Sequence, residues 1–240
     1  MRAKTPALPE TTALVIEGNL ARVTKTTIER QVRTSDLLEE LGRTQPLHTG
    51  LLPPGCIAFS RTTDSRNQVN TLYVLERPAG PVTVRYKKAP SHEAQKEEDI
   101  VSLTLSWPRT QWLVHWVGPA ISQLLMTCTK TPICSLEDAI FVLPMPNLYE
   151  GGHGGVCLGN LTLSDEPGPA ARTARLVETV LSSLWNTDLL PDYEALGLKG
   201  LEDWAERSAA DPLFGLSLNY KPHNEETLAN LMATILGEAP

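Results

Sequence analysis

The residues best suited to chemistry lie in one segment, 143–160, with the sequence Leu-Pro-Met-Pro-Asn-Leu-Tyr-Glu-Gly-Gly-His-Gly-Gly-Val-Cys-Leu-Gly-Asn. This segment combines an asparagine next to proline, Asn147, with a glycine-rich loop and a cysteine, Cys157. Glycines allow tight bends of the backbone and leave space above the sulfur for a bulky reactant. We therefore interpret Cys157 as an exposed nucleophile, although a lone cysteine is more often a buried apolar residue.

Asn147 is the second residue of this segment that could take part in a reaction. Pro144 and Pro146 restrict the backbone that carries it, so its side-chain amide could be held in a fixed position. A fixed amide donor near a thioester carbonyl stabilises the oxyanion that forms when an amine attacks. An asparagine that only forms a turn is the structural alternative, and the sequence leaves both interpretations open.

These residues resemble the active-site signature of ubiquitin-conjugating enzymes. That signature is His-Pro-Asn, a short turn and then Gly-x-Ile-Cys-Leu, and this chain has Pro146-Asn147, a glycine loop and Val156-Cys157-Leu158. Two departures are visible. Met145 stands where the signature has histidine, and the loop between Asn147 and Cys157 is longer than usual.

A bacterial group is more similar still. Segment 143–160 resembles the conjugating-like proteins called prokaryotic family D, the group that includes the PRTRC system protein B. Two other stretches are similar to the same group, namely 51–55 and 184–189. The resemblance thus extends from about residue 50 to residue 190, although only segment 143–160 is specific.

The resemblance implies an enzyme of bacterial ubiquitin-like conjugation with a ubiquitin-conjugating (UBC)-like fold. Cys157 would accept the C-terminus of a ubiquitin-like modifier from the thioester of a ThiF-like activating enzyme and pass it to an amine or another thiol. Asn147 would be the oxyanion donor and His153 a proton carrier. Asn160 and Asp165 would orient an incoming lysine. A JAB-type deconjugating peptidase is a further implied partner, and antiviral defence or a plasmid-borne system is the implied setting.

Two other functions remain open at this point. The first is a UBC-like domain that serves as a non-catalytic adaptor, since the signature histidine is missing. The second is a cysteine hydrolase, which needs a histidine as general base, and only His153 lies close to the cysteine in sequence. For His153 itself, a solvated side chain in a glycine run is the structural alternative.

Composition excludes several further classes. The 21 Lys and Arg residues against 28 Asp and Glu residues give a net charge of -7, which disfavours a nucleic-acid partner. The chain has no apolar run of membrane-spanning length and no secretory signal, so we expect a cytoplasmic protein without a membrane partner. The 4 cysteines are then expected to be reduced. No nucleotide-binding motif and no usual zinc spacing occurs, so we expect neither cofactor nor metal.

The elements that must position the segment are predicted from hydrophobic patterning. The first half is rich in β-branched residues and turn signals, which indicates strands arranged as a meander. We expect strands over 13–17, 20–33, 56–59, 69–76, 82–87, 100–107 and 111–117. The strands 69–76 and 82–87 flank Arg77-Pro-Ala-Gly, a sequence typical of a hairpin turn. The stretch 122–146 gives no clear prediction.

Helical spacing appears mainly in the second half. One apolar helix face is expected from Leu176 to Trp185, and short helices are expected over 36–42 and 201–207. A last helix would begin at Asn224 as N-cap and end at Gly237. The expected fold is α+β: a UBC-like antiparallel meander sheet with helices packed at one side and a C-terminal helical region.

One UBC-like domain over 13–240 is expected to follow a loose tail, 1–12. The expected core includes tryptophans and three of the cysteines, namely Trp107, Trp112, Trp116, Trp185, Cys56, Cys128 and Cys134. The remaining histidines, His48, His92, His115 and His223, are expected at the surface or with satisfied ring nitrogens.

Overall fold

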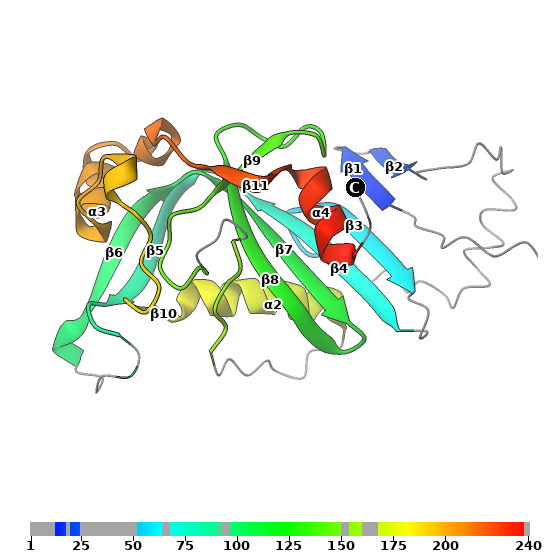
Figure 1. Ribbon diagram of the computed structural model, residues 1–240, viewed down its shortest axis with the longest axis horizontal. Helices are drawn as coiled ribbons and strands as arrows, with labels where there is room; N and C mark the ends of the chain where they lie inside the picture. Colours follow the sequence, from blue (N-terminus) through cyan, green and yellow to red (C-terminus); the bar gives the residue numbers. More distant parts are fainter. Residues whose placement is uncertain are drawn as a thin grey trace, which may run out of the picture.

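The computed structural model describes residues 13–17, 20–24, 52–63, 68–90, 92, 97–149, 154–159 and 168–237. Within these ranges the chain is α+β (Figure 1). The strands are β1 (Ala13–Glu17), β2 (Leu20–Thr24), β3 (Cys56–Thr63), β4 (Val69–Arg77), β5 (Gly80–Lys87), β6 (Ile100–Trp107), β7 (Arg109–Val117), β8 (Ala120–Thr129), β9 (Ala139–Val142), β10 (Leu184–Trp185) and β11 (Pro222–Thr227). The α-helices are α2 (Pro169–Ser182), α3 (Leu201–Ala210) and α4 (Leu228–Leu236), and the 3-10 helices are η1 (Glu97–Asp99), η2 (Glu194–Leu196) and η3 (Phe214–Ser217).

The larger sheet has 8 strands in the order β11-β9-β8-β7-β4-β3-β1-β2, and all its neighbours are antiparallel. Its centre is the antiparallel set β3-β4-β7-β8, which is not the simple meander expected, because β5 and β6 leave for a second sheet between β4 and β7. The register there places Val74 opposite Leu113, and Leu113 opposite Leu125. All three side chains are buried, which explains why β-branched and aliphatic residues dominate these strands.

Both β4 and β5 form as the sequence predicted, but the prediction that they pair as a hairpin is wrong. β4 pairs with β7, whereas β5 pairs with β6 in a second sheet of order β10-β5-β6. The connection between them changes sheets at Gly80, whose φ of 152° few other residues adopt. The interior residues of β7 are buried on both faces of the sheet. A strand of this kind is more stable in the centre of the larger sheet than at an edge, because only the centre covers both of its faces.

The helices cover both faces of the larger sheet, which corrects the expectation that they pack at one side. Alternate residues of β4 point to opposite faces. Tyr73 and Leu75 share a core with helix α2, whereas Leu72 and Val74 share a core with helix α4. Figure 1 shows α2 and α4 on opposite sides of the strands. The sheet is therefore the middle layer of three.

Two helix boundaries differ from the prediction. The helix expected to continue to Trp185 ends at Ser182, and Leu184–Trp185 forms β10, parallel to β5. The last helix begins after Thr227, whose hydroxyl accepts the N–H of Asn230, and not at Asn224, which lies in β11. Gly237 ends this helix with a φ of 69°, as expected.

The predicted core is confirmed for the four tryptophans and for Cys128, which are all buried. It is wrong for Cys134, which is exposed, and only in part right for Cys56, which is half-buried. All 4 cysteines are free thiols. Two of the histidines, His115 and His223, are buried. Nδ1 of His223 accepts from the N–H of Glu225 at 3.1 Å, whereas neither ring nitrogen of His115 has a hydrogen-bond partner among the described residues.

Some predictions fall on residues outside the described ranges, namely the tail 1–12, the strand continuation 25–33, the helix 36–42 and His48. The single domain over 13–240 stays a prediction. In the described part of the chain, no helix combines the length and the apolar character needed to cross a membrane.

Candidate active site

Asn147 and Cys157 lie directly opposite each other in a short two-stranded ribbon. The N–H of Cys157 donates to the carbonyl oxygen of Asn147 at 2.8 Å, and the N–H of Tyr149 donates to the carbonyl oxygen of Gly155 at 2.8 Å. Leu148 and Val156 form the antiparallel bridge between these two bonds. Two residues that the sequence singled out at separate positions are thus neighbours in space.

The ribbon is attached to the edge of β8. Strand β9 pairs with β8 only near Thr127 and Cys128, so the edge before these residues is open to another partner. The N–H of Met126 donates to the carbonyl oxygen of Gly154 at 2.7 Å, and the N–H of Val156 donates to that of Leu124 at 2.8 Å. The central sheet therefore fixes the position of the cysteine segment.

Strand alternation decides which side chains of the ribbon are accessible. Leu148 and Val156 point inwards and are each 7% exposed. Because neighbouring residues of a strand point to opposite faces, Tyr149 and Cys157 lie on the outer face. Asn147 is a half-buried turn residue with a left-handed backbone, so this alternation does not apply to it. Cys157 is exposed and Tyr149 is 55% exposed, which gives a reactant access to the sulfur.

Asn147 is held by three hydrogen bonds. Its backbone accepts from Cys157 and donates to the carbonyl oxygen of Leu189 at 3.1 Å, and its Oδ1 accepts from the N–H of Asn186 at 3.4 Å. Its φ of 59° lies in the left-handed region, where asparagine is among the best tolerated residues. Within the described part of the chain its Nδ2 donates to no other group. The turn role of Asn147 is therefore shown by its backbone conformation and by these three hydrogen bonds.

Tyr149 is a site residue that the sequence analysis missed. The pKa of Tyr149 is raised, first by a side-chain hydrogen bond with Cys157, then by the charge of a Cys157 thiolate and by desolvation. A signal was present in the sequence. Tyr149 is a polar aromatic residue within the segment that carries Asn147 and Cys157.

Met145, at the position of the signature histidine, is 1% exposed and belongs to the core that includes Leu143 and Leu148. The segment before Asn147 is thus anchored by apolar packing, where a histidine would need hydrogen bonds.

The other expected site residues, His153, Asn160 and Asp165, lie outside the described ranges. Among the described residues, no group of three or more His, Cys, Asp or Glu side chains is placed to hold a metal ion.

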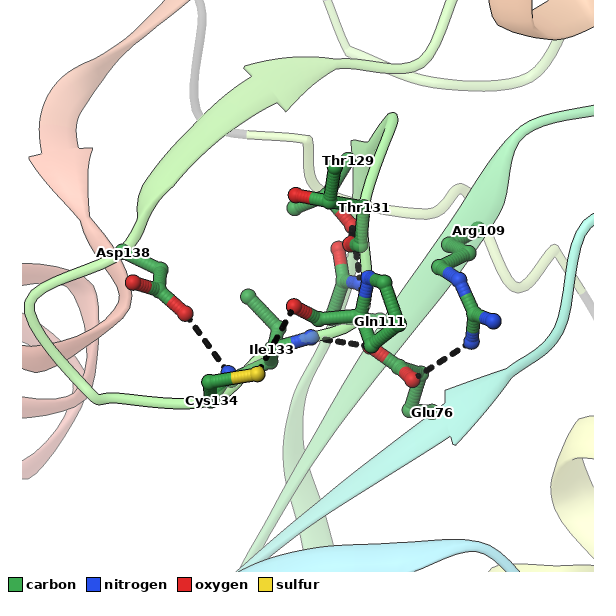
Figure 2. Close-up of polar contacts among 9 residues, drawn as sticks. Glu76, Arg109, Gln111, Thr129, Thr131, Ile133, Cys134 and Asp138 are labelled. Atoms are coloured by element: carbon green, nitrogen blue, oxygen red, sulfur yellow. Dashed lines mark hydrogen bonds and ion pairs between the residues drawn. The ribbon is translucent and has the colours of Figure 1, made fainter.

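A second polar cluster lies around Glu76, and Figure 2 shows its contacts. The Glu76 carboxylate accepts from Arg109 Nη1 at 3.0 Å, from Gln111 Nε2 at 3.3 Å and from the N–H of Ile133 at 3.1 Å. The buried Gln111 also bonds to two threonines of β8, Thr127 and Thr129. These hydrogen bonds join strands β4, β7 and β8 to the loop that carries Ile133, so we interpret the cluster as structural.

Comparisons with protein-family models, curated proteins and solved structures find no match to this chain. The functional argument therefore rests on the geometry around Cys157 and on the residues of its segment.

Proposed function

We propose that this protein is a ubiquitin-like protein conjugating enzyme that carries the modifier as a thioester on Cys157. The observation that carries this proposal is the direct pairing of Asn147 with an exposed Cys157 at the edge of the central sheet. An exposed thiol and an adjacent amide donor are the two groups that thioester transfer requires.

The order of elements supports a UBC-like fold. The asparagine and cysteine segment follows the last strand of the antiparallel set β3-β4-β7-β8. A helix, α2, then packs on one face of that set. Helix α4 on the opposite face and the insertion of β5 and β6 depart from the arrangement that the resemblance implies.

The proposed reaction has two steps. The Cys157 thiolate attacks the thioester carbonyl that an activating enzyme presents, and the bond to the donor sulfur breaks with its electron pair on that sulfur. An amine then attacks the new thioester, and Cys157 leaves as thiolate while the amine loses its proton to solvent. In both steps Nδ2 of Asn147 stabilises the oxyanion. Neither step needs a histidine beside the cysteine.

Covalent charging tests this proposal. The full chain is incubated with its activating enzyme, the modifier and ATP, and analysed on a non-reducing gel and by intact mass. We expect a thiol-sensitive adduct that disappears in Cys157→Ala. Cys134→Ala is the matched control, because Cys134 is also exposed but lies outside the ribbon, and it should charge like the wild type.

The opposite result favours the adaptor. If the modifier is loaded on the activating enzyme and no adduct forms on this chain, the enzymatic proposal is wrong. A binding module would then retain its interactions when Cys157 is replaced by alanine.

A further inference from the structure

Tyr149 is anchored although its side chain is 55% exposed. Its backbone N–H donates to Gly155, and a Cβ added at Gly155 would lie 3.4 Å from Cδ2 of its ring. A side-chain hydrogen bond with Cys157 is the largest cause of the raised pKa of Tyr149. An exposed tyrosine normally gains little from such contacts, so this fixed position needs an explanation.

The register of the ribbon explains how the ring reaches the sulfur. Tyr149 is directly opposite Gly155 and diagonally opposite Cys157. Diagonal neighbours across antiparallel strands lie within reach of aromatic side chains. Because Gly155 has no side chain, the ring can lie along the ribbon with its hydroxyl at Cys157.

We propose that Tyr149 is a catalytic residue that donates a hydrogen bond to the Cys157 sulfur as this sulfur leaves the acyl carbon. This inference rests on the proposed thioester chemistry. When the amine nitrogen attacks, the carbon–sulfur bond breaks and its electron pair moves to sulfur. The phenol stabilises the developing thiolate and keeps its own proton, while the amine proton passes to water.

A phenol is suited to this task because it stays protonated throughout the neutral range. The contact with Cys157 raises the pKa of Tyr149 above its ordinary value of 10.0. The hydroxyl therefore keeps its proton from about pH 7 to 9. Hydrogen bonds to an ionised acceptor are stronger than those between neutral groups, so the bond tightens as the thiolate forms.

The test uses the full chain and a small acyl probe. Exposed thiols are acetylated with S-acetyl-N-acetylcysteamine, and transfer of the acetyl group to free lysine is followed by peptide mass for each cysteine. We expect Tyr149→Phe to slow the loss of acetyl from Cys157 by roughly threefold to tenfold. The ratio between wild type and variant should stay constant from about pH 7 to 9, since the phenol does not ionise there.

Two controls separate the hydroxyl from a structural effect. Acetyl-Cys134 in the same chain is exposed, and its discharge should not change in Tyr149→Phe. Tyr149→Leu should behave like Tyr149→Phe, because only the hydroxyl is proposed to act. Wild-type discharge of Cys157 in Tyr149→Phe, or equal slowing at both cysteines, overturns the inference.

This assay needs neither the modifier nor the activating enzyme, so the two proposals can fail separately. If the modifier charges the chain normally and Tyr149→Phe has no effect on discharge, only the proposed role of Tyr149 is wrong. If the discharge of acetyl-Cys157 depends on Tyr149 but the modifier never charges the chain, only the proposed conjugating function is wrong.

Discussion

At the scale of single residues, the structure shows the turn role of Asn147, and the oxyanion role is the one that we propose. Its left-handed backbone makes the turn, and its Oδ1 accepts from the N–H of Asn186. The turn uses the backbone and one side-chain oxygen, so the amide nitrogen stays available. One substitution can therefore remove the donor and keep the turn.

Asn147→Asp is that substitution. Aspartate tolerates the left-handed backbone and keeps an acceptor for Asn186, but it has no amide donor. We expect a stability within about 0.5 kcal/mol of the wild type in urea unfolding, since no buried group is lost. Transfer of the acyl group from Cys157 should fall by roughly 100-fold, the effect of losing one oxyanion donor.

Asn147→Gly is the control, because glycine also accepts the left-handed backbone and introduces no negative charge. It should lose transfer to a similar extent. Transfer at the wild-type rate in both variants would leave Asn147 with its turn role alone.

At the scale of elements, the ribbon depends on a close approach between backbones. Gly154 has a φ of 63°, and a Cβ there would collide with the carbonyl oxygen of Met126. Gly159 has a similar φ of 53°, but a Cβ there would meet no atom of the described residues within 4 Å. The two glycines have the same left-handed backbone, but only a side chain at Gly154 would collide with a neighbouring strand. They therefore form a matched pair for substitution.

Gly154→Ala should therefore destabilise the protein more than Gly159→Ala. The left-handed backbone costs about 1–2 kcal/mol in either variant. The collision at Gly154 also breaks the pairing with Met126, and the total loss should reach roughly 3–5 kcal/mol in urea unfolding. Equal losses in the two variants would mean that the ribbon can move away from β8 without cost.

The Glu76 cluster offers a second prediction at this scale. Glu76→Gln places an amide group among the three donors from Arg109, Gln111 and Ile133, so at least one of them loses its acceptor. We expect a loss of about 1–3 kcal/mol. Glu202→Gln breaks an ion pair with Lys88 in which the side chains are 50% and 51% exposed, and it should cost less than about 1 kcal/mol. Similar losses in thermal or urea unfolding would contradict a structural role for the cluster.

At the scale of the whole molecule, local patterns predicted the elements better than their partners. The strands β1, β4, β5, β6 and β7 and the helices α3 and α4 follow from alternation and helical spacing. The pairing of β4 with β7 could not be predicted, because the turn at Arg77–Gly80 also fits a hairpin. That pairing is decided by burial of β7 on both faces, which is a tertiary effect.

The site shows the same limit. Cys157 and Asn147 could be singled out from residue type and neighbouring glycines and prolines, because these determine local conformation. Tyr149 required the register of the ribbon, which depends on the edge of β8 left open by β9. Residue types thus indicated the reaction, and long-range pairing decided which side chains meet.

Burial of polar groups in the three layers also has a consequence for the whole fold. His115 of β7 is 6% exposed, and neither ring nitrogen has a hydrogen-bond partner in the part of the chain that the structure describes. Burial lowers the pKa of His115 from its ordinary value of 6.5. The folded chain therefore keeps this ring neutral at a pH at which the unfolded chain already binds a proton.

Below about pH 6.5 the unfolded state binds more protons than the folded state at this site. The free energy of unfolding is therefore highest above that pH and falls as the pH decreases, by at most about 1.4 kcal/mol per pH unit for one site. His115→Leu removes this contribution and leaves the other titrating groups in place. In urea unfolding at pH 7.5 and 5.5, we expect the wild type to lose more stability than His115→Leu between the two conditions. An equal loss in both proteins would mean that His115 binds its proton equally well in the folded and the unfolded chain.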